Sequence, residues 1–124
     1  ITIDSKQILE VAVKAVDDKH AQDIVALDVR EISLLADYFV ICSGNTDRRI
    51  NAIVDEVVEQ AYKNQMDVKR VEGKEASKWV LIDLGDVIVH VFNQSEREFY
   101  QLEKLWSDAP LVDLSEMVVN DSGL

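Results

Sequence analysis

The fold is decided by one stretch of the sequence, Lys78-Trp79-Val80-Leu81-Ile82-Asp83-Leu84-Gly85-Asp86-Val87-Ile88-Val89-His90-Val91-Phe92. Two runs of strand-forming residues, 78–84 and 87–92, are separated by Gly85-Asp86, a two-residue hairpin turn with glycine first. Pairing across this turn sets Leu84 opposite Val87 and Ile82 opposite Val89. The stretch therefore predicts an antiparallel β-hairpin.

The two faces of this hairpin differ in their chemistry. One face is purely aliphatic and consists of Val80, Ile82, Leu84, Val87, Val89 and Val91. Burying six such side chains contributes on the order of 10 kcal/mol, so this face must lie against the core. The other face mixes aromatic, aliphatic and ionisable side chains: Trp79, Leu81, Asp83, Ile88, His90 and Phe92. We expect this mixed face to be covered at its apolar end by another element, or to be kept for a partner.

The sequence before the hairpin predicts two helices and three strands. Apolar residues at helical spacing predict the helices over residues 5–19 and 47–64, with Asp4 as the N-cap of the first. Short apolar runs predict strands, of which the second is apolar on both faces and therefore central, at 23–29, 38–42 and 67–71. The fold class expected is α/β, a mixed, roughly five-stranded sheet flanked by helices.

A third helix is predicted directly after the hairpin. Ser95 and Glu98 form a capping box there, and the apolar arc of the helix consists of Phe99, Leu102, Leu105 and Trp106. We expect residues 1–110 to form a single α/β domain. The tail, residues 111–124, is expected to be poorly ordered unless its residues Leu111, Val112 and Leu114 dock on the domain.

The charge balance restricts the possible partners. Lys and Arg number 13 and Asp and Glu number 24, a net charge of −11. Phosphate backbones repel so acidic a protein, which leaves little direct nucleic-acid contact and favours a basic protein partner. Excess acid alone would also serve to keep a cytosolic protein soluble. With one cysteine, no signal peptide and no apolar run near 20 residues, we expect a cytoplasmic protein without membrane contact.

No residue pattern predicts catalysis or a cofactor. Cys42 lies in an apolar strand with neither histidine at a fixed spacing, which favours a buried structural cysteine. The His, Cys and carboxylate residues do not show metal-ligand spacing. Ser43-Gly44-Asn45, at the end of a strand and before a helix, would suit an anion, although a single glycine is what any such corner needs.

Metal-dependent nucleotidyl transfer is the enzymatic alternative. Such enzymes use a similar Gly-Ser turn and then two aspartates one residue apart on the next strand. The corresponding strand here, 67–71, has one acid and two bases. Asp83 and Asp86 straddle a turn at a spacing that does not let them converge on one metal. We therefore expect the protein not to be an enzyme.

Several blocks of the sequence resemble the ribosomal silencing factor family (RsfS, also called Iojap or YbeB). The resemblance extends from the first helix to Trp106 and leaves out the segment after Pro110. Its most specific blocks are residues 83–91 and the run that contains Arg97, Tyr100 and 102–106. Its other markers are residues 23–29, Cys42-Ser43-Gly44 with Arg48, Glu72-Gly73 and Trp79.

The resemblance implies a regulator that performs no reaction. Members of the family bind the large ribosomal subunit through ribosomal protein L-fourteen and block joining of the small subunit, and related organelle proteins act in ribosome assembly. The family fold is similar to the nucleotidyltransferase fold without its catalytic acids. A role in assembly of the large subunit without silencing remains an alternative, as does a homodimer in the absence of the partner.

The mixed hairpin face provides the candidate partner-binding residues. A large aromatic anchor between acidic side chains is typical of an interface hot spot. We expect Trp79, Leu81 and Tyr100 to form its apolar centre, with His90 at its edge. Asp83, Glu96 and Glu103 are expected to pair with Lys or Arg of the partner. The alternative for Trp79 is that the third helix covers it.

Overall fold

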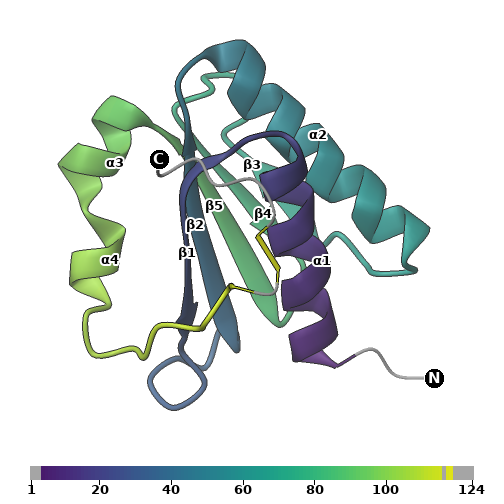
Figure 1. Ribbon diagram of the computed structural model, residues 1–124, viewed down its shortest axis with the longest axis vertical. Coiled ribbons are helices and arrows are strands. Elements are labelled where there is room, and N and C mark those ends of the chain that lie inside the picture. Colours follow the sequence, from purple (N-terminus) through teal and green to yellow (C-terminus); the bar gives the residue numbers. More distant parts are fainter. Residues whose placement is uncertain (1–3, 116, 119–124) are drawn as a thin grey trace.

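The structure is a computed structural model in which residues 4–115, 117 and 118 are described, apart from the side chain of Glu103. Its centre is one five-stranded sheet with the strand order β1-β2-β5-β4-β3 (Figure 1). The strands are β1 (Gln22–Asp28), β2 (Tyr38–Gly44), β3 (Arg70–Glu72), β4 (Trp79–Asp83) and β5 (Val87–Asn93). The β2–β5 pair is parallel and the other three pairs are antiparallel, so the predicted mixed sheet is confirmed.

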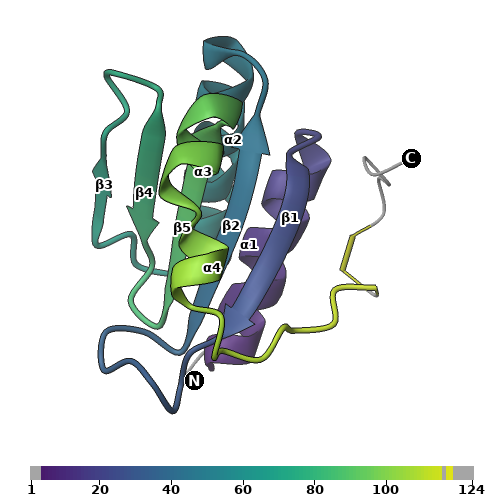
Figure 2. The same ribbon diagram turned by 90° about the vertical axis from the view of Figure 1, so that its left-hand side faces the viewer.

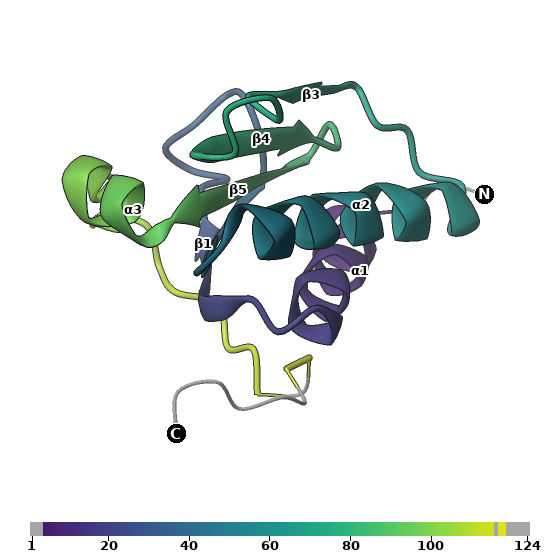
Figure 3. The same cartoon turned by 90° about the horizontal axis from the view of Figure 1, so that it is seen from above.

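Helices cover the two faces of the sheet unequally. The long helices α1 (Ser5–Asp18) and α2 (Asp47–Lys63) pack side by side on one face. The short helices α3 (Gln94–Tyr100) and α4 (Leu102–Leu105) lie on the opposite face (Figures 2 and 3). Two separate hydrophobic clusters result, a large one under α1 and α2 and a smaller one under α3 and α4.

The hairpin forms in the predicted register. Ile82 pairs with Val89, and the backbone N–H of Leu84 donates to the carbonyl of Val87 at 2.9 Å. All six side chains of the aliphatic face are buried in the larger cluster. The central position predicted for 38–42 is also confirmed, since β2 lies between β1 and β5 and every one of its residues is buried. Asp4 caps α1 through a capping box with Gln7.

The predicted start of the third helix is wrong. The N-cap is Asn93, the last residue of β5, and its side chain accepts a hydrogen bond from the backbone N–H of Glu96 at 2.8 Å. Ser95 therefore lies within the first turn and caps nothing. Asn is as good an N-cap as Ser, and Asn93 already has the extended backbone that the N-cap position requires.

The single continuous helix expected after the hairpin is also wrong. Gln101 has a left-handed backbone with φ of 46°, which ends α3 and starts α4 in a new direction. Residues before and after this break do not share one face, so the predicted apolar arc is not formed. Leu102 is buried and Trp106 partly buried, whereas Phe99 and Leu105 are exposed by 76% and 74%.

The segment after Pro110 runs along the edge of β1. The carbonyl of Pro110 accepts from the N–H of Asp28, and the N–H of Val112 donates to the carbonyl of Ala26, both at 2.9 Å. Val112 and Leu114 pack against the larger cluster and Met117 is buried in it, while the side chain of Leu111 stays exposed. Of the three residues whose docking was expected to order the tail, Val112 and Leu114 pack on the domain, and the side chain of Leu111 does not. Residues 116 and 119–124 lie outside the described part of the chain.

The strand expected at 67–71 is shorter and later than predicted, and comprises only Arg70–Glu72. Its partner β4 ends at Asp83, and Arg70 is the residue that pairs with it. Residues before Arg70 therefore have little of β4 left to pair with.

Within the described residues, no helix is both long and apolar enough to cross a membrane.

Candidate partner-binding surface

The mixed face of the hairpin is only partly covered. Helices α3 and α4 lie over β5 and β2, and none of the helices in the described part of the chain lies in front of β3 and β4 (Figure 2). Trp79, Leu81 and Asp83 occur at alternate positions along β4 on this uncovered half, and each is half-buried. The sheet therefore presents a row of accessible side chains there, beside a helix edge.

Trp79 is held in an aromatic group at the border between covered and uncovered sheet. Its ring stacks on Phe92 with a centroid distance of 5.0 Å and an interplanar angle of 28°, and Tyr100 of α3 lies 4.8 Å away. The indole N–H donates a hydrogen bond to Nδ1 of His90 at 3.1 Å. Two arrangements were predicted for Trp79, exposure to a partner and coverage by the third helix. The structure lies between them, because Trp79 packs against α3 on one side and stays half-buried.

Exposed apolar surface continues from Trp79 onto the end of α3. Tyr100 is 45% exposed, and Phe99 packs edge-on against it at 5.0 Å. Phe99 was missing from the candidate residues because helical spacing assigned it to the core. No local signal could have identified it, because Phe99 is exposed through the left-handed break at Gln101, a backbone that glutamine seldom adopts. We define the docking surface as Trp79, Leu81, Asp83, Phe99 and Tyr100.

The three candidate acids have different surroundings. Asp83 lies 3.6 Å from Nε of Arg70, and its carboxylate also accepts from the N–H of Gly85 at 2.8 Å. Its charge is therefore partly balanced within the chain. Glu96 is half-buried in the first turn of α3, where the positive end of the helix dipole stabilises its negative charge. The side chain of Glu103 lies outside the described residues.

His90 does not lie at the edge of the surface as expected. Only 6% of it is exposed, because Phe39 packs edge-on against the imidazole at 5.4 Å and Trp79 and Phe92 flank it. This burial disfavours the charged imidazolium and lowers the pKa of His90 from 6.5 to about 4. His90 lies on the predicted face of the strand, but beneath the docking surface.

The pKa of His90 predicts how stability depends on pH. Unfolded His90 takes up a proton near pH 6.5 and folded His90 only near pH 4, so its contribution is complete above pH 6.5 and falls as the pH decreases toward 4. Between pH 7 and 5 the free energy of unfolding should fall by roughly 2 kcal/mol from this residue. Denaturant unfolding of His90→Leu and wild type at several pH values measures this contribution. The free energy of unfolding of the variant should fall by roughly 2 kcal/mol less than that of wild type between pH 7 and 5. Equal pH profiles would contradict the low pKa of His90.

The strand-to-helix corner at Ser43 is occupied by structural hydrogen bonds. The Ser43 hydroxyl donates to the carbonyl of Gln22 and accepts from Nη1 of Arg97, each at 3.2 Å. The side chains of Ser43 and Arg97 are both buried. Cys42 is buried as predicted, and burial raises the pKa of its thiol to about 12. A thiol with that pKa is a poor nucleophile at neutral pH.

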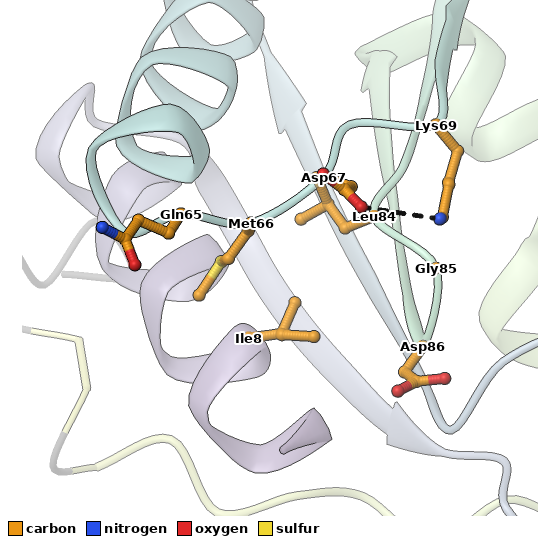
Figure 4. Close-up of a pocket in the computed structure, with 8 residues that line it drawn as sticks. All are labelled: Ile8, Gln65, Met66, Asp67, Lys69, Leu84, Gly85 and Asp86. Atoms are coloured by element: carbon orange, nitrogen blue, oxygen red, sulfur yellow. Dashed lines mark ion pairs between the residues drawn. The ribbon is translucent and has the colours of Figure 1, made fainter. Parts of the chain in front are cut away.

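The two acids considered for metal-dependent catalysis have different surroundings. Asp83 faces Arg70 on the uncovered half of the sheet, whereas Asp86 lies at the rim of an open cavity of about 450 Å³ near Asp67 and Lys69 (Figure 4). Asp67 in that cavity forms an ion pair with Lys69 at 3.9 Å. Nowhere in the described chain do three or more His, Cys, Asp or Glu side chains come together as a metal site.

Comparison with known proteins identifies close relatives. The chain is 55% identical over 112 residues to the ribosomal silencing factor RsfS of Bacillus subtilis, covering 90% of this chain and 95% of that protein. It is 33% identical to the mouse protein named mitochondrial assembly of ribosomal large subunit protein 1, covering 85% of this chain and 47% of that one. It is also 33% identical to the chloroplastic protein Iojap of maize, with 82% and 44% covered.

Solved structures share the fold. A crystal structure of a protein from Bacillus halodurans matches with a TM-score of 0.80 and 49% identity over 89% of this chain and all of the other. A Chromobacterium violaceum protein matches with a TM-score of 0.83 and 30% identity, over 85% and 88%. The family model described as "Ribosomal silencing factor during starvation" matches residues 2–123, so it continues past Pro110, where the resemblance was expected to end. The chain belongs to the ribosomal silencing factor family.

Proposed function

We propose that this protein binds the large ribosomal subunit through ribosomal protein L-fourteen and sterically blocks the small subunit, which represses translation. The observation that supports this most is the docking surface: an aromatic group on an uncovered half-sheet, with Trp79 half-buried and Tyr100 and Phe99 exposed. Large aromatic side chains at the centre of an accessible patch are the usual hot spots of protein interfaces.

The charge of the protein fits such a partner. The net charge of −11 favours association with a basic protein, and ribosomal proteins are typically basic. Glu96 is the candidate acid of this region with no ion pair to a basic side chain among the described residues. Asp83 would contribute less, because it already faces Arg70.

Silencing of this kind requires no reaction and no cofactor. A body of 14.0 kDa on the intersubunit surface of the large subunit needs only to overlap the incoming small subunit. A typical interface buries about 800 Å² per partner, which a half-sheet and a helix edge can supply. The same docking surface would serve a homodimer when the ribosomal partner is absent.

Subunit joining tests the proposal directly. Isolated large subunits are incubated with the protein and sedimented, and small subunits are then added and the joined particles counted. We expect the protein to co-sediment with large subunits and to lower the number of joined particles, whereas Trp79→Ala should do neither to the same extent. Absence from the large-subunit fraction would contradict the proposal.

Two outcomes would favour other functions. Binding to large subunits without any effect on joining would support a role in assembly, the process named in the mouse relative. Heat released on titration with a nucleotide and Mg²⁺ would support nucleotidyl transfer. We expect no such heat, because Asp83 and Asp86 lie in different surroundings and Ser43 is engaged by Arg97.

A further inference from the structure

The buried imidazole of His90 lies beside the indole of Trp79, on the neighbouring strand. His90 is on β5 and pairs with Leu81 of β4, so its side chain shares the face of the sheet that carries the docking surface. The only hydrogen bond of Trp79 Nε1 in the described chain goes to Nδ1 of this imidazole, at 3.1 Å. Phe39 closes the imidazole from the other side.

This hydrogen bond determines which nitrogen of the imidazole carries the proton. A nitrogen that accepts from an N–H must carry a lone pair, so Nδ1 of His90 is unprotonated and the proton of the neutral ring is on Nε2. Burial lowers the pKa of His90 to about 4, so the acceptor is present at every pH near neutrality. The indole of Trp79 therefore has a permanent acceptor under physiological conditions.

A histidine at this position carries a cost to the fold. Nε2 is buried and has no hydrogen-bond partner within the described residues. An unsatisfied buried donor lowers stability, and an aliphatic side chain of similar shape would avoid that cost. What offsets this cost among the described contacts is the hydrogen bond that Nδ1 accepts from the indole of Trp79.

We infer that His90 is a positioning residue, whose Nδ1 fixes the Trp79 ring in the orientation that the docking surface presents to its partner. This inference rests on the proposed function. The stacking contacts with Phe92 and Tyr100 restrict how the indole tilts, whereas the hydrogen bond selects which edge of the ring points inward. A ring ordered before binding loses less conformational entropy on binding, which corresponds to roughly tenfold in affinity.

Two variants of equal shape test the inference. Asn and Leu are nearly isosteric, and the amide oxygen in His90→Asn would stand near the position of Nδ1, whereas His90→Leu supplies no acceptor. We expect His90→Leu to bind isolated ribosomal protein L-fourteen roughly tenfold more weakly, with an unchanged or higher melting temperature. His90→Asn should bind within about threefold of wild type even though its melting temperature is lower.

The order of the two variants decides between positioning and simple packing. If His90 only fills space, affinity follows stability, and His90→Leu binds at least as tightly as His90→Asn. That result would overturn the inference. The melting temperatures confirm that both variants are folded when their affinities are compared.

Nuclear magnetic resonance of the free protein separates this inference from the proposed function. The Trp79 indole signal is identified in a Trp106→Phe background, and its proton exchange with water is measured. We expect slow exchange in wild type and His90→Asn and faster exchange in His90→Leu; equal rates in all three would refute the positioning of the ring. If the exchange rates differ as expected but wild type does not bind L-fourteen, the proposed partner is wrong and the positioning stands.

Discussion

Replacement of Trp79 by alanine is expected to weaken binding to ribosomal protein L-fourteen by roughly 30-fold or more, about 2 kcal/mol. The indole is the largest side chain of the docking surface, and it is in contact with both Phe92 below and Tyr100 beside it. Its removal would take away the centre of the apolar contact and would also remove one of the rings that pack against Tyr100. Titration calorimetry with the isolated ribosomal protein measures the change.

A matched control removes an exposed aromatic side chain elsewhere. Tyr62 is 69% exposed on α2, which lies on the other face of the sheet. Tyr62→Ala should bind with wild-type affinity if the docking surface is the site of contact. Wild-type affinity in a folded Trp79→Ala protein would instead show that the indole only supports the smaller hydrophobic cluster.

The register of the hairpin could be predicted to the residue because it is set by local sequence, although the strands run 79–83 and 87–93 where 78–84 and 87–92 were predicted. Strict alternation over β4 and β5 and the Gly85-Asp86 turn together fix the register, and a slip by one residue would place the aliphatic face in solvent. The face on which Trp79, Leu81 and His90 lie followed from that register alone. The 4.8 Å distance between Trp79 and Tyr100 did not, because it depends on where α3 packs.

The exposure of single residues on that face could not be predicted from the sequence. His90 is buried because Phe39 of a different strand reaches it, and Asp83 is paired because β3 places Arg70 opposite it. Both contacts join segments that are far apart in the sequence. The break at Gln101 has no local signal either, since a left-handed backbone is uncommon for a residue other than Gly, Asn or Asp.

Gly73→Ala is expected to have the largest effect on stability, a loss of about 3 kcal/mol or more in the free energy of unfolding. Gly73 has φ of +85°, a conformation that alanine adopts only with strain. A Cβ atom there would also overlap the carbonyl oxygen of Trp79, so that the backbone at the start of β4 must move. Denaturant unfolding followed by circular dichroism measures the loss.

Gly85→Ala separates the two causes of that loss. Gly85 has a similar φ of +91°, but the nearest atom to an added Cβ is the flexible end of Lys69 at 3.7 Å. Backbone strain alone should cost Gly85→Ala about 1 kcal/mol, so the excess in Gly73→Ala reports the clash with Trp79. Equal losses would mean that β4 yields to the added methyl group without cost. An excess would instead mean that Gly73, a residue outside the docking surface, is required because Trp79 lies so close to it.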